Sequence, residues 1–252
     1  MIRPLHFNHN VGSIDAFTTE RGAADIASPY SEFNCCDYTG DSAEHIAQCR
    51  KVLCSGLGIA ADHIVTARQT HSAEVAIIDR LPVEPFVGVD ALVTKLRGVV
   101  VGVFTADCVP ILLCDPIEGV IAAVHAGWRG TVAGIVANAV RAMEGIGAKA
   151  ERIEAVVGPS ICQKCFEVGN EVVVEFARHA LSLNSIIVRN PTTFKAHIDL
   201  AAANCHLLEQ SGVPRGNILL SGLCTKCHPD RFFSARNLGV NSGRVLTGIV
   251  RH

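Results

Sequence analysis

The chain has 252 residues, of which 49% are hydrophobic and 18% charged, and its formal net charge is −2. A chain of this size can bury a large core, and its balanced charge excludes the basic surface that binds nucleic acid or an anionic membrane. We find neither the apolar segment of a signal peptide nor an apolar run near the ~20 residues of a membrane span, so we expect a cytoplasmic protein without nucleic-acid or membrane partners.

The first predicted element is a helix from Asp41 to Gly56. Asp41 is a residue type that caps helix N-termini, and Gly56 is a typical stop signal. Between these ends, the apolar side chains recur at helical spacing, at Ile46, Cys49 and Leu53.

Short runs, several of them rich in valine and isoleucine, predict the strands of a sheet because they are too short for buried helices. They are Ile64–Ala67, Val75–Ile78, Val99–Phe104, Val120–Val124, Ile153–Val157, Ile186–Val188 and Asn217–Leu220. Helical patterns separate them: Thr131 caps a helix that reaches Met143, a second helix covers Gly169–Leu181, and Asp199 caps a third that ends before Gly212. The elements interleave without an internal repeat or a long linker, which predicts one mixed α/β domain over residues 1–252.

Three segments place a metal-ligand or nucleophile side chain where an apolar stretch gives way to a polar turn. His71 lies in "IVTARQTHSAE", Cys108 in "VVVGVFTADCVP" and His125 in "VIAAVHAGWRG", and Pro110 and Gly127 mark the ends of the last two stretches. Because ligands gather beyond the ends of buried strands, we predict that these three side chains meet. Two imidazoles and one thiolate leave a fourth position of a tetrahedral zinc ion open, which is typical of a catalytic zinc.

The same three residues also fit a different chemistry. In a cysteine hydrolase or amidase, a neighbouring histidine withdraws the thiol proton and the thiolate attacks a carbonyl carbon. That mechanism needs one base and one orienting group, whereas a zinc ion would use both histidines. Zinc is the preferred interpretation, and the Cys-His hydrolase is the alternative.

The segment "HAGWRGTV" places Gly127, Gly130 and Arg129 directly before the helix predicted to begin at Thr131. Backbone N–H groups at a helix start and a guanidinium group both bind anions, so the segment is a candidate phosphate site. The alternative is structural: the glycines permit the strand-to-helix turn, and Arg129 pairs with a carboxylate.

The chain contains 11 cysteines, an odd number in a chain too large to depend on a disulfide framework. Four of them form two C-x-x-C pairs, Cys162 with Cys165 and Cys224 with Cys227. The two pairs together are a candidate second, structural zinc site, and the alternative is that they are buried thiols.

A series of motifs resembles, in order and spacing, the laccase-domain family over nearly the whole chain. The motifs are "RQTHSAEV", "VDALVT", "TADCVPILLCDP", "AAVHAGWRGTVAGIV", "GPSICQKCFEVG", "DLAAANCHLLEQSGV" and "CTKCHPDRFFSARN". The resemblance implies a layered αββα fold with two mixed β-sheets. It also implies a zinc-dependent purine nucleoside phosphorylase, which acts on adenosine, inosine, guanosine and methylthioadenosine with inorganic phosphate and also deaminates adenosine.

Carried over residue by residue, the resemblance makes His71, Cys108 and His125 both the metal ligands and the catalytic residues. Asn34 matches a recurring family position, and the family's substrate-binding arginine corresponds to Arg21, so we expect both at the substrate together with Arg129. Arg21 departs from the family pattern, because it is displaced by one position and Glu20 stands in its place.

The family's older name, multicopper polyphenol oxidase, adds a copper-dependent oxidase as a further alternative. The chain lacks the paired His-x-His segments that supply the imidazoles of a multicopper cluster. Copper is nevertheless a possible alternative occupant of a site with two histidines and one cysteine, because it outcompetes zinc for most nitrogen and sulfur ligands.

Overall fold

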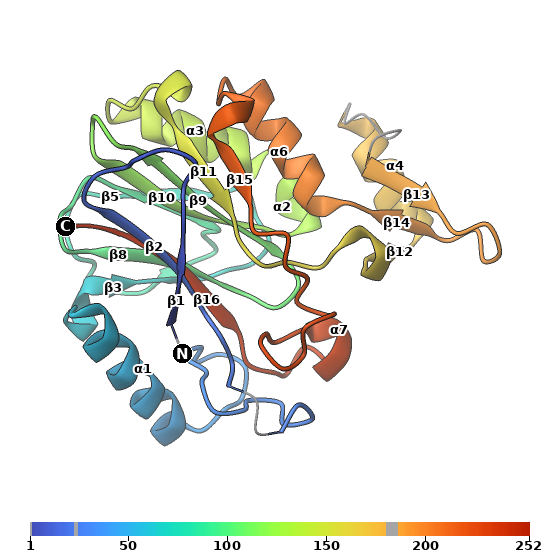
Figure 1. Ribbon diagram of the computed structural model, residues 1–252, viewed down its shortest axis with the longest axis horizontal. Coiled ribbons are helices and arrows are strands. Elements are labelled where there is room, and N and C mark those ends of the chain that lie inside the picture. The colour runs from blue at the N-terminus through green and yellow to red at the C-terminus, as the bar shows by residue number, and fades with distance from the viewer. Residues whose placement is uncertain (1, 23–24, 180–185) are drawn as a thin grey trace.

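Four layers of secondary structure build the protein. The computed structural model describes residues 2–22, 25–179 and 186–252, and Figure 1 shows two β-sheets packed between outer helices. The αββα arrangement with two mixed sheets is thereby confirmed.

Both central sheets combine parallel and antiparallel neighbours. Across the first sheet the order is β1 (Ile2–Leu5), β2 (Ile14–Thr19), β16 (Val245–Arg251), β8 (Val100–Thr105) and β3 (Ile64–Val65). Across the second it is β15 (Ile218–Leu220), β11 (Glu154–Val157), β9 (Val109–Asp115), β10 (Val120–Ala126), β7 (Ala91–Thr94) and β5 (Val75–Ile78). Two small sheets pair β4 (Ala67–Arg68) with β6 (Phe86–Val87), and β12 (Glu167–Val168) with β14 (Ala196–Ile198) and β13 (Ile187–Arg189).

Hydrophobic clusters fill the three interfaces between these layers. Leu112 of β9 packs between the two sheets, whereas the next residue, Leu113, packs under the helices of the second sheet. In the first sheet, Val101 of β8 likewise faces the second sheet, and Val100 faces the opposite side. Because successive side chains of a strand point to opposite faces, a strand buried on both faces must be apolar at nearly every position.

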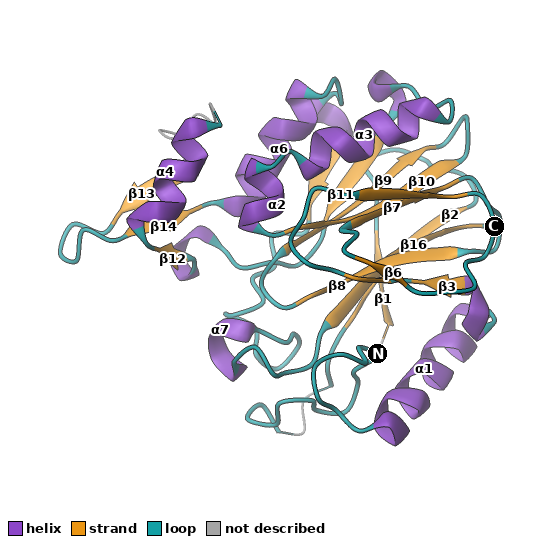
Figure 2. Ribbon diagram, turned by 180° about the vertical axis from the view of Figure 1, so that it is seen from behind, coloured by secondary structure: helices purple, strands orange, loops and turns teal. Residues whose placement is uncertain are grey.

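Helices cover the outer faces of both sheets. Helix α1 (Ala43–Leu57) packs on the first sheet, and α3 (Ile135–Gly145) and α6 (Leu200–Gln210) cover the second (Figures 1 and 2). The shorter helices are α2 (Trp128–Val132), α4 (Asn170–Arg178) and α7 (Ala235–Leu238), with 3₁₀ turns η1 to η4 at Ala61–His63, Ala150–Arg152, Gln163–Cys165 and Arg215–Asn217. Among the helices of the described ranges, none has the length and apolar character to cross a membrane.

The predicted first helix is present, but both of its predicted ends were wrong. Ser42, not Asp41, is the N-cap, because its side chain accepts the backbone N–H of His45 at 3.2 Å. Asp41 instead binds the His45 ring Nδ1 at 2.7 Å. The helix continues past Gly56 and ends at Gly58, where a φ of 64° takes the chain into the left-handed conformation that ends many helices.

The helix predicted to begin at Thr131 is two helices. Thr131 lies inside α2, where its hydroxyl donates to the Gly127 carbonyl oxygen at 2.9 Å instead of capping a helix. Gly134, with a φ of 84°, then separates α2 from α3. The prediction was wrong because Gly134 was not recognised as a break.

The two later helix predictions are confirmed at their N-termini. Asp199 is the N-cap of α6 and accepts the backbone N–H of Ala202 at 2.9 Å. Gly169 is the N-cap of α4. The predicted end of that helix at Leu181 lies outside the described residues.

Most predicted strands are present with small shifts, but the run Ile64–Ala67 is divided between β3 and β4. The long strands β2, β9 and β16 were not predicted. Pro110 was interpreted as the end of a stretch, yet it lies inside β9 opposite His125 of β10. A proline is tolerated there because its nitrogen lies on the side of β11, whose pairing with β9 extends only to Ile111.

Candidate metal centre

Two loops and the end of a strand bring the predicted three-residue cluster together. His71 lies between β4 and β5, Cys108 in the turn between β8 and β9, and His125 in β10 just before its last residue. The ligand atoms of the three side chains all lie within 4.8 Å of one another, and His71 Nε2 is 3.6 Å from Cys108 Sγ. Since β8 and β9 belong to different sheets, Cys108 lies where the chain crosses from one sheet to the other.

The carboxylate of Asp90, just before β7, organises this centre. Asp90 is fully buried, and its Oδ1 accepts the His125 ring Nδ1 at 2.6 Å. This bond fixes the orientation of the imidazole and leaves Nε2 of His125 for the cluster. The backbone N–H of His125 also donates to the Asp90 carbonyl oxygen at 2.7 Å, so side chain and main chain are fixed together.

The same carboxylate holds the loop that carries His71. It accepts the backbone N–H groups of Thr70, His71 and Ser72 at 3.1, 3.0 and 2.8 Å, as well as the Ser72 hydroxyl at 2.8 Å. These bonds stabilise the left-handed backbone of His71, whose φ of 62° is uncommon for a residue other than glycine. One buried carboxylate therefore positions both histidines.

The charged forms of Cys108, His125 and Asp90 stabilise one another. Burial alone would raise the pKa of Cys108, but attraction to His125 and His71 lowers it to about 6. Burial alone would lower the pKa of His125, but Cys108 and Asp90 raise it to about 9. Burial raises the pKa of Asp90, while the bonds from His125 and Ser72 lower it to about 2. The centre is thus suited to a thiolate, the form of cysteine that binds metals.

Gly127 gives the cluster its space. A Cβ atom at this position would lie 2.6 Å from His71 Cδ2 and 3.2 Å from Cys108 Sγ. Only glycine lets the backbone pass this close to the ligand atoms. His125 is buried, Cys108 half-buried and His71 exposed, so the cluster is open to solvent on one side. A nitrogen and sulfur donor set with one open side fits a catalytic zinc ion.

Arg129 follows His125 by four residues in the chain and lines a cavity. It lies in α2, is exposed, and stacks on the Trp128 ring at 4.3 Å. Both residues line a cavity of about 610 Å³, together with Lys195 and Arg236. Within the described ranges, no hydrogen bond or ion pair engages the Arg129 guanidinium, unlike that of Arg236, which donates to the Glu167 carbonyl oxygen. The predicted carboxylate partner of Arg129 is therefore not found there.

Asn34 lies in a hydrogen-bond network of its own. Its Oδ1 accepts the backbone N–H groups of Cys36 and Arg244, and its Nδ2 donates to the Cys36 carbonyl oxygen and to Asp41. These bonds join the chain before α1 to the start of β16. Substrate binding by Asn34 stays a prediction.

Arg21 is buried, with a relative exposure of 1%. Its guanidinium donates to four carbonyl oxygens, those of Asp25, Ile26, Ser28 and Pro229. It also stacks on the Phe233 ring at 4.9 Å. These contacts join two loops, and a role of Arg21 at the substrate stays a prediction.

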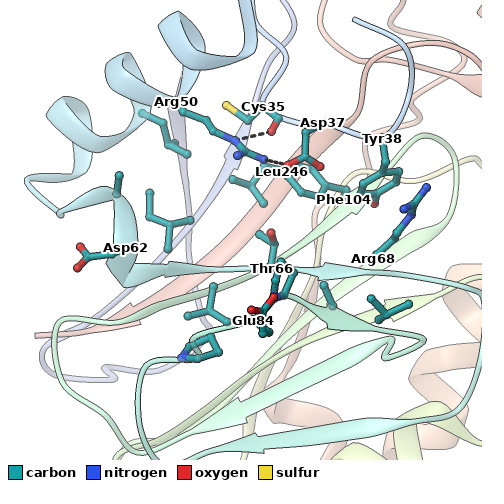
Figure 3. A pocket seen from close by; sticks show the side chains of 18 of the residues that line it. Cys35, Asp37, Tyr38, Arg50, Asp62, Thr66, Arg68, Glu84, Phe104 and Leu246 are labelled. Atoms are coloured by element: carbon teal, nitrogen blue, oxygen red, sulfur yellow. Dashed lines mark hydrogen bonds and ion pairs between the residues drawn. The ribbon is translucent and has the colours of Figure 1, made fainter. Parts of the chain in front are cut away.

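A second cavity, of about 680 Å³, lies between α1 and strands β3, β4 and β6 (Figure 3). Arg50 lines this cavity, where it donates to the Cys35 carbonyl oxygen and forms a 2.7 Å ion pair with Asp37. Arg68 and Tyr38 line it as well, but none of the predicted site residues does.

The sequence analysis missed two residues of the centre. Asp90 was quoted only as part of the motif "VDALVT", and Gly127 only as a turn residue. An acidic residue directly before a buried apolar strand was the available signal, because a buried carboxylate needs hydrogen-bond partners.

The fold and this centre define a mixed α/β protein with a His-Cys-His site suited to a metal. Residues 15–252 match the family described as multi-copper polyphenol oxidoreductase laccase, and the chain belongs to this family. Over 258 residues it is 50% identical to adenosine deaminase RL5 from an unknown prokaryotic organism, covering 99% of this chain and 98% of that protein. It is 40% identical to a purine nucleoside phosphorylase of Bacteroides thetaiotaomicron, covering 95% and 92%.

Solved structures share the fold. The chain is similar to the Bacillus licheniformis hypothetical protein YfiH, with a TM-score of 0.88 at 27% identity over 95% of this chain and 93% of that one. It is also similar to YlmD from Geobacillus stearothermophilus, with a TM-score of 0.87 at 30% identity over 96% and 93%.

Proposed function

We propose that the protein is a cytoplasmic, zinc-dependent purine nucleoside phosphorylase with adenosine deaminase activity. The observation that carries this proposal is the open His71, Cys108 and His125 cluster, in which Asp90 orients both histidines. The names of two similar proteins, a purine nucleoside phosphorylase and an adenosine deaminase, supply the substrate class. The proposed substrates are adenosine, inosine, guanosine and methylthioadenosine.

Each residue of the centre has a distinct proposed role. His71, Cys108 and His125 would hold the zinc ion, and when bound it supplies Lewis acidity and makes nearby water more acidic. Asp90 keeps the His125 ring in one orientation, and Gly127 keeps space beside His71. Arg129, which has no carboxylate partner in the described ranges, is proposed to bind the phosphate co-substrate.

The two reactions differ in their nucleophile. In phosphorolysis, an oxygen of inorganic phosphate bonds to the anomeric carbon of the ribose while the glycosidic bond breaks, and the purine leaves after taking up a proton. In deamination, water adds to C6 of adenine and ammonia leaves. Both reactions need a pocket that orients a purine nucleoside towards its nucleophile. One centre can therefore serve both.

Product analysis of adenosine with and without phosphate tests this proposal. With phosphate, chromatography should show adenine and ribose 1-phosphate. Without phosphate, adenine release should stop while slow formation of inosine continues. Adenine release that is equally fast without phosphate would make the enzyme a hydrolase and overturn the phosphorylase assignment.

A second candidate function rests on the geometry of the same side chains. A cysteine hydrolase places a cysteine, a histidine and a carboxylate in the same order. Here Cys108 lies next to His71 and His125, and Asp90 binds His125 Nδ1. The two functions differ in their need for metal. A metal-free protein that hydrolyses amides, and does so more slowly when zinc is added, would favour the hydrolase.

Copper is the alternative metal at this centre. The alternative activity that would accompany copper is the polyphenol oxidase activity that the family description names. Elemental analysis of the purified protein identifies the metal. We expect zinc at the three-residue centre.

A further inference from the structure

The two C-x-x-C pairs follow neighbouring parallel strands. Strand β11 pairs with β15 in parallel, with Val157 opposite Leu220. Beyond the strand ends, a further bridge joins Ser160 to Cys224. Because parallel strands end at the same edge of a sheet, the two loops that carry the cysteines leave the sheet side by side.

All four sulfur atoms of these pairs meet in one place. The Sγ atoms of Cys162, Cys165, Cys224 and Cys227 lie within 4.8 Å of one another, and those of Cys165 and Cys227 are 3.5 Å apart. Four thiolates at about 2.3 Å from a zinc ion lie about 3.8 Å apart in a tetrahedron, so these separations fit a Cys₄ site. They are longer than the S–S bond of a disulfide, which is about 2.05 Å, and all four cysteines are free.

A backbone N–H group points at the sulfur cluster. The backbone N–H of Cys162 donates to Cys224 Sγ at 3.3 Å, the kind of bond that stabilises negative charge on sulfur. Both pairs carry a lysine directly before their second cysteine, Lys164 and Lys226. The two cysteine loops thus carry two positive charges close along the chain to a site whose net charge, with four thiolates and one zinc ion, would be about −2.

We propose that Cys162, Cys165, Cys224 and Cys227 bind a structural zinc ion that joins the loop after β11 to the loop after β15. The protein supplies all four ligands, so this site leaves no open position for a substrate. It is separate from the His71, Cys108 and His125 centre and does not depend on the proposed nucleoside chemistry.

The joined loops support the Cys108 turn through its neighbour Asp107. The Asp107 carbonyl oxygen accepts the backbone N–H of Ile161 at 2.9 Å, and its Oδ1 accepts the Thr225 hydroxyl at 2.7 Å. One contact therefore comes from each cysteine loop. Asp107 has a φ of 91°, which needs such support in a residue other than glycine. Loss of the structural zinc should loosen the turn that positions Cys108.

Zinc content of variants tests the proposal directly. Wild-type protein purified in reducing buffer without chelator should contain about two zinc ions per chain, one at each site. Cys227→Ser, which changes the exposed ligand, and Cys108→Ala should each contain about one, and the double variant none. Cys227→His should keep about two, because three cysteines and a histidine also bind zinc. Cys54→Ser, in α1, is the control and should keep the wild-type content.

A spectroscopic measurement keeps the test independent of stability and activity. Cobalt added to metal-free Cys108→Ala protein should give a thiolate-to-metal charge-transfer band and the d–d bands of a tetrahedral site, and adding Cys227→Ser to that variant should abolish both. Wild-type protein with about one zinc, unchanged by Cys227→Ser, would overturn the proposal. So would disulfides among these four cysteines in protein kept under reducing conditions.

Discussion

At the scale of the residue, Asp90 is the side chain on which the geometry of the metal centre depends most. Changing Asp90 to Asn would place an amide NH₂ against N–H or O–H donors that now meet a carboxylate oxygen. We expect metal affinity to fall about 10- to 100-fold, the usual effect of losing a group that orients a metal ligand. The free energy of unfolding should fall by about 3 kcal/mol, because buried donors lose their acceptor. Competition against a chelator and denaturant unfolding measure the two effects.

Asp115→Asn is the matched control for this prediction. Asp115 is as buried as Asp90 and accepts the backbone N–H groups of Ile117, Glu118 and Lys149, together with two bonds from Arg152. None of these hydrogen-bond partners belongs to the metal centre. Its loss should destabilise the fold by a similar amount without changing metal affinity. Equal metal loss in both variants would show that Asp90 acts only through general stability.

Gly127→Ala tests the space beside His71. The backbone of Gly127, with φ −70° and ψ 166°, suits alanine, so the change acts only through the added Cβ. That atom would displace the His71 ring, and we expect metal affinity to fall at least about 10-fold in a folded protein. Gly145→Ala, where an added Cβ meets no atom within 4 Å, is the control. Isothermal titration with zinc measures both, and normal zinc affinity in Gly127→Ala would contradict the geometry.

Arg129→Lys tests the phosphate site. Lysine keeps the charge but loses the two-pronged hydrogen bonding of the guanidinium, so KM for phosphate should rise about 10-fold and KM for nucleoside much less. Arg215→Lys, an exposed arginine paired with Glu209, should leave both constants unchanged. Steady-state kinetics with phosphate and adenosine varied in turn supply the measurement. An unaltered phosphate dependence would return Arg129 to a structural role.

The sequence could predict which three side chains meet at the candidate metal centre, but not the residue that orients two of them. His71, Cys108 and His125 are recognisable because their side chains bind metals and each lies near the end of an apolar stretch. The role of Asp90 depends on two segments distant in the chain folding around one carboxylate, which no local pattern shows.

At the scale of the element, strands and the crossing between the two sheets were harder to predict than helix N-caps such as Asp199. The capping signal at Asp199 was correct because a side chain and a nearby backbone N–H decide it locally. Strand β9 was missed because Pro110 has the character of a strand breaker, and its place near the start of the strand is set by neighbouring strands. The crossing of the chain between sheets at Cys108 follows from the same long-range pairing.

The connection from β9 to β10 should make stability depend on pH. Burial raises the pKa of Asp115, but the backbone N–H groups of Glu118 and Lys149 and the Arg152 guanidinium lower it below the ordinary 3.8. A lowered carboxyl pKa stabilises the folded state above the ordinary value, and the contribution is lost as the pH falls through the lower folded-state pKa. The difference in unfolding free energy between wild type and Asp115→Asn should therefore be large at neutral pH and shrink below about pH 4. Urea unfolding across pH measures it, and a constant difference would contradict the assignment.

At the scale of the whole molecule, the layered fold places the candidate metal centre where its two sheets are linked. Cys108 lies in the connection from the first sheet to the second, and His125 lies at the end of a central strand of the second. The layer order itself was implied only by the family resemblance. The continuous apolar run of β8 indicates a strand that is buried on both faces, but not which sheet or helix covers each face.

The central claim is that the metal held by His71, Cys108 and His125 drives turnover of purine nucleosides. Stepwise addition of zinc to metal-free protein, with phosphate and adenosine present, tests this claim most directly. Turnover should be absent without metal and rise in proportion to occupancy of the centre, while Cys108→Ala, with its four-cysteine site still able to fill, should show none at any zinc concentration. Full turnover of adenosine by metal-free protein, or by Cys108→Ala, would contradict the account.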